Sequence, residues 1–137
     1  MIDCLIIGDS IAVGVSSARP ECVSYAHVGW NSLQFNSKYL KIVSETNSNT
    51  TIISLGANDH PGIKTLEELR KLRLSIKSSR VFWIDPGQQR RPVAHQAMMT
   101  IAKEYGDTVL LRPIHHTSND KVHPTYKGYT ILGNQTR

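Results

Sequence analysis

The residues best suited to chemistry in this chain are a serine near one end and an aspartate and a histidine near the other. Ser10 follows an apolar run that stops at Gly8, and Asp120 precedes His123 by three residues. A serine hydroxyl is a weak nucleophile at neutral pH, so it needs a base, and the base needs an orienting partner. With His123 as the base and Asp120 folded back onto its ring, these residues predict nucleophilic acyl transfer.

Acyl transfer also needs hydrogen-bond donors for the negative oxygen of its tetrahedral intermediate. Asn58, in the segment "GAND", offers a side-chain amide, and the backbone amide of Ser10 is a second donor. Gly29 offers a third, because a residue without a Cβ allows close approach to its N–H. We therefore expect an oxyanion hole formed by Ser10, Gly29 and Asn58, with Asp9 and Asp59 shaping the two turns.

Three further side chains are candidates for substrate binding. His60 stands beside the "GAND" segment, and Arg90 and Arg91 follow an apolar run that ends at Ile84. The two arginines are suited to hold an acidic group on a substrate. For each of the three, a solvent-exposed surface side chain is the plainer alternative.

A metal site is the chemical alternative to a triad. His115 and His116, together with Asp120 and His123, form a stretch rich in possible ligands. The pattern matches no zinc spacing, and adjacent histidines seldom reach one ion from one loop. We therefore expect no metal and no other cofactor.

The elements that must position these residues alternate between strand-like and helix-like segments. Continuous apolar runs bounded by glycine or proline are typical of strands buried on both faces. Helix starts are expected at Asn31 or Ser32, at Thr65 with a capping box to Glu68, at Pro92 with a stop at Gly106, and near Thr125. The expected strands are residues 2–7, 22–26, 51–55, 81–84 and 108–111.

Alternation of this kind implies right-handed crossovers and a parallel sheet. The predicted fold is α/β: one domain over residues 1–137, a three-layer α/β/α sandwich with a central five-stranded parallel sheet of flavodoxin-like type. The loops at the carboxyl ends of such strands form the functional edge. Ser10, the Gly29 loop, Asn58 and the loop after Leu111 are therefore expected to meet there.

Four sequence blocks, in order, resemble the SGNH hydrolases, also called GDSL esterases and lipases. These are "GDS" at residues 8–10, the glycine of "HVGWNS", "GAND" at residues 56–59 and "DKVH" at residues 120–123. The resemblance implies Ser10 as nucleophile, Asp120 and His123 as its partners, and Gly29 and Asn58 in the oxyanion hole. The match at the second block is short, so Gly29 is its weakest point.

The resemblance, together with the small size of the chain, implies a substrate class. With 137 residues the chain has no insertion that could form a lid, so an open, shallow site is expected. Such a site suits short acyl groups, such as acetyl esters on glycans. The alternative from a different class is a non-catalytic glycan-binding domain that keeps the fold.

Composition narrows the remaining possibilities. The net charge of +5 comes from scattered basic residues, so no nucleic-acid partner is predicted. No apolar run is long enough to cross a membrane, and no secretory signal is recognisable, which leaves a cytoplasmic protein or one whose leader has been removed. Cys4 and Cys22 lie in apolar segments and are expected to be buried thiols. The source and the oligomeric state stay open.

Overall fold

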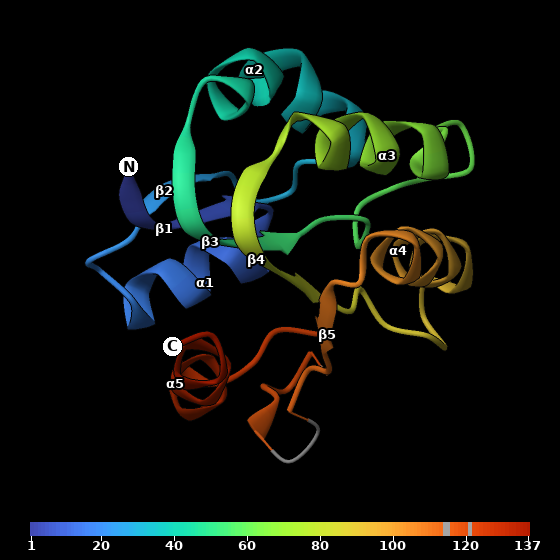
Figure 1. Cartoon of the computed structure of the whole chain (residues 1–137). Coiled ribbons are helices and arrows are strands. Elements are labelled where there is room, and N and C mark those ends of the chain that lie inside the picture. The colour runs from blue at the N-terminus through green and yellow to red at the C-terminus, as the bar shows by residue number, and fades with distance from the viewer. Residues whose placement is uncertain (114–115, 121) are drawn as a thin grey trace.

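Five parallel strands form the centre of the protein, in the order β2-β1-β3-β4-β5 (Figure 1). The computed structural model describes residues 1–113, 116–120 and 122–137. Neighbouring strands are in parallel register throughout, and Ile7 of β1, for example, lies between Tyr25 of β2 and Ile53 of β3. The strands are β1 (Ile2–Gly8), β2 (Val23–Ala26), β3 (Asn47–Ser54), β4 (Lys77–Ile84) and β5 (Thr108–Leu110).

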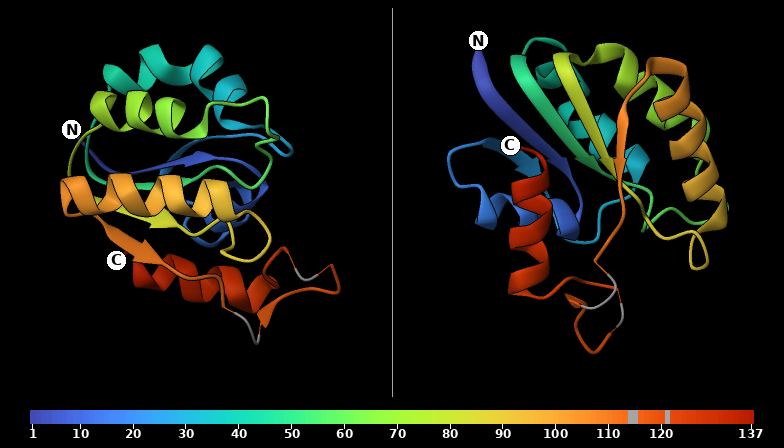
Figure 2. Two further views of the ribbon diagram at one scale, coloured as in Figure 1. Left: turned by 90° about the vertical axis from the view of Figure 1, so that its right-hand side faces the viewer. Right: turned by 60° about the horizontal axis from the view of Figure 1, so that its bottom comes forward.

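Helices cover both faces of this sheet and complete three layers (Figure 2). The two helices α1 and α5 pack together on one face, and the other three cover the opposite face. The predicted α/β/α sandwich is therefore confirmed. The helices are α1 (Ser10–Ala18), α2 (Ser32–Ser44), α3 (Thr65–Ser75), α4 (Pro92–Tyr105) and α5 (Tyr126–Gln135).

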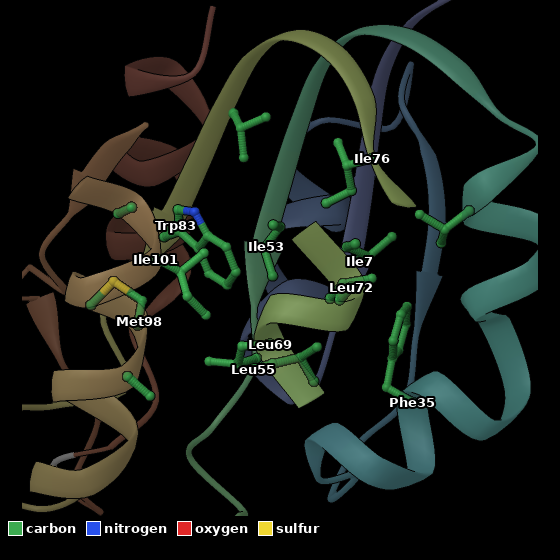
Figure 3. Close-up of a cluster of buried hydrophobic side chains, with 14 of the residues drawn as sticks. Ile7, Phe35, Ile53, Leu55, Leu69, Leu72, Ile76, Trp83, Met98 and Ile101 are labelled. Atoms are coloured by element: carbon green, nitrogen blue, oxygen red, sulfur yellow. The ribbon is translucent and has the colours of Figure 1, made fainter. Parts of the chain in front are cut away.

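The hydrophobic core lies in two parts, one on each side of the sheet. The larger part packs Phe35, Leu72 and Met98 of three helices against Ile53 and Trp83 of the central strands (Figure 3). Because both faces of the strands are covered, their apolar residues run continuously instead of alternating with polar ones. This is why the apolar runs in the sequence identified the strands.

Strands β3 and β4 begin four residues earlier than expected, because polar residues extend them. The hydroxyls of Ser48, Thr51 and Ser78 lie within 2.6–3.0 Å of one another across the two strands. These polar groups satisfy each other, so the strand continues through a segment that reads as a loop.

The predicted helix starts were confirmed, and only the capping contact expected for α3 differs. Asn31 caps α2 in a capping box with Gln34, and α4 begins at Pro92 and ends at Gly106. The expected capping box of α3 was wrong, since no side chain caps this helix. Thr65 instead donates to Asp59, and the Glu68 carboxylate accepts from Asn36.

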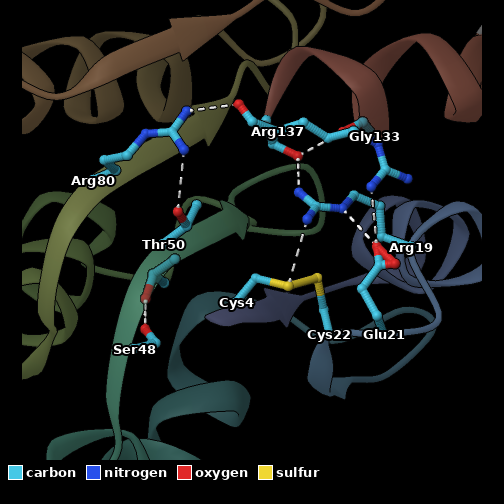
Figure 4. Close-up of a disulfide and its surroundings, with 11 residues drawn as sticks. Cys4, Arg19, Glu21, Cys22, Ser48, Thr50, Arg80, Gly133 and Arg137 are labelled. Carbon is cyan, nitrogen blue, oxygen red and sulfur yellow. Dashed lines mark hydrogen bonds and ion pairs between the residues drawn. A yellow bond between two sulfur atoms is a disulfide. The ribbon is translucent and has the colours of Figure 1, made fainter. Parts of the chain in front are cut away.

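Cys4 and Cys22 form a disulfide, so the expectation of buried thiols was wrong (Figure 4). The reason is the strand order. Because β1 and β2 are neighbours in register, the two Cα atoms lie 4.9 Å apart, within the range that a disulfide spans. The bridge weighs against the cytoplasmic expectation, since disulfides persist chiefly in oxidising compartments.

The strand order also fixes where a ligand site forms. From β1 the chain moves outward to β2 and then crosses back to β3, so the connections leave β1 and β3 in opposite directions. Ligands of open α/β sheets bind at this point, beyond the carboxyl ends of the strands.

Among the described residues, none of the helices has the length and apolar character needed to span a bilayer.

Candidate active site

Ser10 is the first residue of α1, directly beyond the carboxyl end of β1. The turn that places it is held by Asp9, which caps the helix. One carboxylate oxygen of Asp9 accepts hydrogen bonds from the Ile11 amide at 3.1 Å and from the Ser54 hydroxyl at 2.9 Å. The Asp9 amide also donates to the Ser54 carbonyl. The turn is thus fixed to β3, and Ser10 is held at the functional edge.

Burial perturbs the Asp9 carboxyl strongly. The residue is 1% exposed, and among the described residues its second carboxylate oxygen has no hydrogen-bond partner. Burial raises the pKa of Asp9 to about 6, against hydrogen bonds that lower it. Above this pH the Asp9 carboxyl is ionised, and its buried charge destabilises the folded state while its hydrogen bonds shape the turn.

His123 reaches Ser10 from a loop 113 residues further along the chain. Its Nε2 lies 2.7 Å from the Ser10 Oγ, and its Nδ1 lies 2.7 Å from the Asp120 carboxylate. An ionised carboxylate can only accept a hydrogen bond, so the proton sits on Nδ1 and Nε2 is free to accept the hydroxyl proton. The three residues predicted to act together are therefore brought into one connected chain of hydrogen bonds.

Asp120 organises the loop as well as the ring. Its second oxygen accepts from the amides of Val122 and His123 and from the Ser118 hydroxyl, at 2.9–3.0 Å. The hydrogen bond from the His123 ring, followed by those from the two amides, holds the pKa of Asp120 well below its usual range. The carboxylate thus stays charged opposite His123 even in acidic solution.

Arg112 fastens this loop to the rest of the protein. Its guanidinium donates to the Val122 carbonyl at 2.9 Å and to the Pro86 carbonyl at 2.8 Å. One side chain therefore joins the histidine loop to the turn after β4. This residue drew no attention in the sequence, because a lone arginine after a strand carries no motif.

Helix α5 packs closely on α1, the helix that begins with Ser10. The Tyr129 ring of α5 lies where a side chain on Gly14 of α1 would be, so only glycine permits this close approach. Since Ser10 begins α1 and His123 shortly precedes α5, the contact aligns the two ends of the site. Figure 2 shows the two helices side by side.

Asn58 lies in the same pocket as Ser10, as expected for an oxyanion donor. Its side-chain amide donates one N–H to the Trp30 carbonyl at 3.0 Å, which orients the group. The second N–H of this amide has no acceptor among the described hydrogen bonds. Asp59 secures this loop by accepting from the Ser32 amide and the Thr65 hydroxyl, each at 2.8 Å. Asp59 thus has the loop-shaping position that the sequence suggested.

The other two predicted donors differ in how well the structure places them. No acceptor for the Ser10 amide occurs among the described hydrogen bonds, so this N–H is available at the start of the helix. Gly29 lies in the exposed loop after β2 with φ 81°, outside the described lining of the pocket. Its oxyanion role stays a prediction.

The pocket around Ser10 is small, with a volume of about 240 Å³. Arg90 and Arg91 line it, whereas His60 does not belong to its described lining, and a role for the arginines in substrate binding stays a prediction. The His60 ring accepts from the Gly62 amide within its own exposed turn. The lining comprises Ser10, Ile11, Ala57, Asn58, Pro86, Arg90, Arg91, Asp120, Val122 and His123.

A second histidine–aspartate pair, missed in the sequence, orders the turn behind the arginines. His95 Nδ1 lies 2.9 Å from the buried Asp85 carboxylate, which also accepts from the Gly87 amide at 2.8 Å. His95 also borders a shallow hollow of about 730 Å³ along α4, which contains none of the residues around Ser10. Its evident role is to fix the turn between β4 and α4.

Metal binding has no support within the described part of the chain. His115, a member of the alternative ligand set, lies outside the described residues. Among the residues that are described, no group of three histidine, cysteine, aspartate or glutamate side chains could hold an ion.

Comparison with known proteins places the fold. No protein-family model matches the chain, and no curated protein matches it in sequence. Solved structures match the chain in fold. A lipase/acylhydrolase from Enterococcus faecalis superposes with a TM-score of 0.74 at 16% identity, covering 98% of this chain and 92% of that one.

Two further structures agree. A GDSL-like lipase from Bacteroides thetaiotaomicron has a TM-score of 0.68 at 16% identity, covering 96% of this chain and 84% of that one. A variant of an acetyl xylan esterase from Geobacillus stearothermophilus has a TM-score of 0.64 at 18% identity, covering 96% and 91%. The chain has the SGNH hydrolase fold, as its four sequence blocks implied.

Proposed function

We propose that this protein is a serine ester hydrolase of the SGNH type, in which Ser10, His123 and Asp120 act as a catalytic triad. The observation that carries the proposal is the unbroken chain of two 2.7 Å contacts, from the Ser10 hydroxyl through the His123 ring to the Asp120 carboxylate. The fold shared with lipases, acylhydrolases and an esterase supports the same reaction class.

In the first half of the reaction, the Ser10 oxygen attacks the ester carbonyl carbon while His123 Nε2 takes the hydroxyl proton. The carbonyl oxygen becomes an oxyanion, which accepts hydrogen bonds from the Ser10 amide and the Asn58 side chain. A donor of this kind typically contributes about 10²–10³ in rate. The protonated His123 then gives its proton to the leaving alcohol oxygen as the carbon–oxygen bond breaks, and an acyl-serine remains.

In the second half, water repeats the sequence. His123 takes a proton from the water as the water oxygen attacks the acyl-serine, and the same two donors hold the new oxyanion. The proton then returns to the Ser10 oxygen as the acid departs. Asp120, whose pKa is held low, stabilises the positive ring formed in each half.

For the substrate, we propose a small O-acyl ester, with acetyl on carbohydrate as the leading case. The pocket of about 240 Å³ has room for a short acyl group but little for a fatty chain. One structural neighbour is named an acetyl xylan esterase, which is a precedent for this chemistry on this fold.

The decisive experiment is hydrolysis of para-nitrophenyl acetate by wild type and by Ser10→Ala. We expect the variant to lose at least about 10³-fold in kcat, because the nucleophile is gone. Ser17→Ala is the matched control, since Ser17 lies exposed on the same helix. Equal rates for wild type and Ser10→Ala would overturn the proposal.

A fluorophosphonate probe separates an enzyme from a binding domain that has the same fold. We expect covalent labelling of wild type and of Ser17→Ala, and none of Ser10→Ala. A folded wild-type protein that stays unlabelled and cleaves no ester would favour the glycan-binding alternative.

Extending the acyl chain from acetate to octanoate tests the size of the pocket, and we expect kcat/KM to fall along the series.

A further inference from the structure

Part of the wall of the pocket carries positive charge that the reaction itself does not use. Arg90 and Arg91 both line the space around Ser10, at the turn between β4 and α4. We propose that the natural substrate carries an anionic group, such as a carboxylate, on its alcohol part close to the ester. This inference rests on the proposed function and names the class of alcohol that the site selects.

The turn that presents the two arginines is well ordered by its own hydrogen bonds. The buried Asp85 carboxylate accepts from Gly87 at its start and from His95 in α4. The Arg91 amide donates to the Gly87 carbonyl at 2.8 Å. A turn held in this way has little backbone freedom to lose when a ligand binds, which favours affinity.

The two arginines have different tasks. Arg91 donates through Nε to the Ala57 carbonyl at 2.7 Å, so it joins the arginine turn to the loop that carries Asn58. Arg90 is exposed, and no acceptor for its guanidinium occurs among the described hydrogen bonds and ion pairs. Arg90 is therefore the side chain with donors to spare for a ligand, and a planar guanidinium matches a carboxylate in a two-point contact.

The charge balance of the pocket agrees. Asp120 is the only acid among the described lining residues, and its carboxylate is already engaged by the His123 ring. The nearby Arg112 guanidinium is balanced chiefly by the buried acids Asp85 and Asp9, so the excess positive charge at the pocket comes from Arg90 and Arg91. A negative group is therefore attracted to this side of the pocket. Since the proposed acyl group is a small uncharged acetyl, the charge belongs on the alcohol.

The test uses two acetyl esters of equal size that differ in charge. These are 4-acetoxy-3-nitrobenzoate, which is anionic, and 4-acetoxy-3-nitrobenzamide, which is neutral. The kcat/KM of each is divided by its rate of hydrolysis by imidazole, which removes the difference in leaving-group reactivity. We expect wild type to prefer the anion by about tenfold, the effect of one hydrogen-bonded ion pair.

Three variants identify the residue responsible. Arg90→Gln should reduce the preference toward unity, and Arg90→Lys should retain part of it, because the charge stays while the two-point contact is lost. Lys41→Gln is the control: Lys41 is an exposed cation near the end of α2, far from the carboxyl edge of the strands, and its removal should leave the ratio unchanged. Added salt should weaken the preference of wild type.

Failure of this inference is distinguishable from failure of the proposed function. Equal use of the two esters by wild type, or a preference that Arg90→Gln retains, overturns the inference and leaves ester hydrolysis standing. If wild type cleaves neither ester, the proposed function fails. The inference is then decided by titrating the uncleaved esters into Ser10→Ala, followed by NMR, where tighter binding of the anion that depends on Arg90 supports it and equal binding overturns it.

Discussion

Replacing Asp9 with asparagine should remove a contribution that destabilises this protein as pH rises from 4 to 7. Burial raises the pKa of Asp9 from its ordinary value of 3.8 to about 6. Because a difference of 1 in pKa corresponds to about 1.36 kcal/mol, keeping Asp9 ionised costs the folded state about 3 kcal/mol at neutral pH. Asparagine retains an oxygen that can accept from Ile11 and Ser54, and it does not ionise.

The sign follows from proton binding. Between the ordinary value near 4 and the folded value near 6, the folded state holds the Asp9 proton more tightly than the unfolded state does. The contribution of Asp9 to the free energy of unfolding therefore falls as pH rises through this window and levels off above it. Relative to Asp9→Asn, wild type should lose about 2 to 3 kcal/mol between pH 4 and pH 7.

The measurement is urea unfolding of both proteins at half-unit steps from pH 4 to pH 8, followed by tryptophan fluorescence. The quantity of interest is the difference in unfolding free energy between wild type and Asp9→Asn at each pH, in which the titration of all other groups cancels. A difference that stays constant, or that grows in favour of wild type as pH rises, would refute the claim that ionisation of the buried Asp9 carboxyl destabilises the folded state.

Other changes have equally definite expectations. Asp120→Asn should lower kcat by about 10²–10⁴, because the His123 ring loses the acceptor that fixes its proton on Nδ1; an unchanged stopped-flow rate would contradict this. Arg112→Met should lower kcat by about 10- to 100-fold by releasing the histidine loop, with far-UV circular dichroism unchanged; full activity would rule out a positioning role. The Cys4→Ala/Cys22→Ala double variant should lose about 3 kcal/mol of stability, since the bridge closes a short loop; an equal midpoint in denaturant would show that the bridge contributes nothing.

The sequence was sufficient for the fold because the strands are buried on both faces. Runs such as residues 81–84 could not be read in another way once they alternated with helix-like segments. The starts of β3 and β4 were not predictable, because Ser48, Thr51 and Ser78 satisfy one another only after the two strands have paired. The disulfide was missed for a related reason, since Cys4 and Cys22 become neighbours through the strand order alone.

In the site, chemistry guided the prediction further than position did. Ser10, His123 and Asp120 were identifiable because each needs the next to function, and the structure brings them together. Arg112 was not identifiable, because it acts by donating to backbone carbonyls, and carbonyls leave no trace in a sequence. His60 was a candidate for the pocket from its position beside "GAND", with an exposed surface side chain as the alternative, and in the structure its ring accepts from the Gly62 amide in its own exposed turn.

The separation of 113 residue numbers between Ser10 and His123 has a consequence for the chain during its synthesis. Ser10 is synthesised early and His123 late, and α5 must pack on α1 before the two side chains can meet. Until then the serine is an ordinary alcohol. The ester hydrolysis that we propose can therefore begin only after α5 has docked on α1.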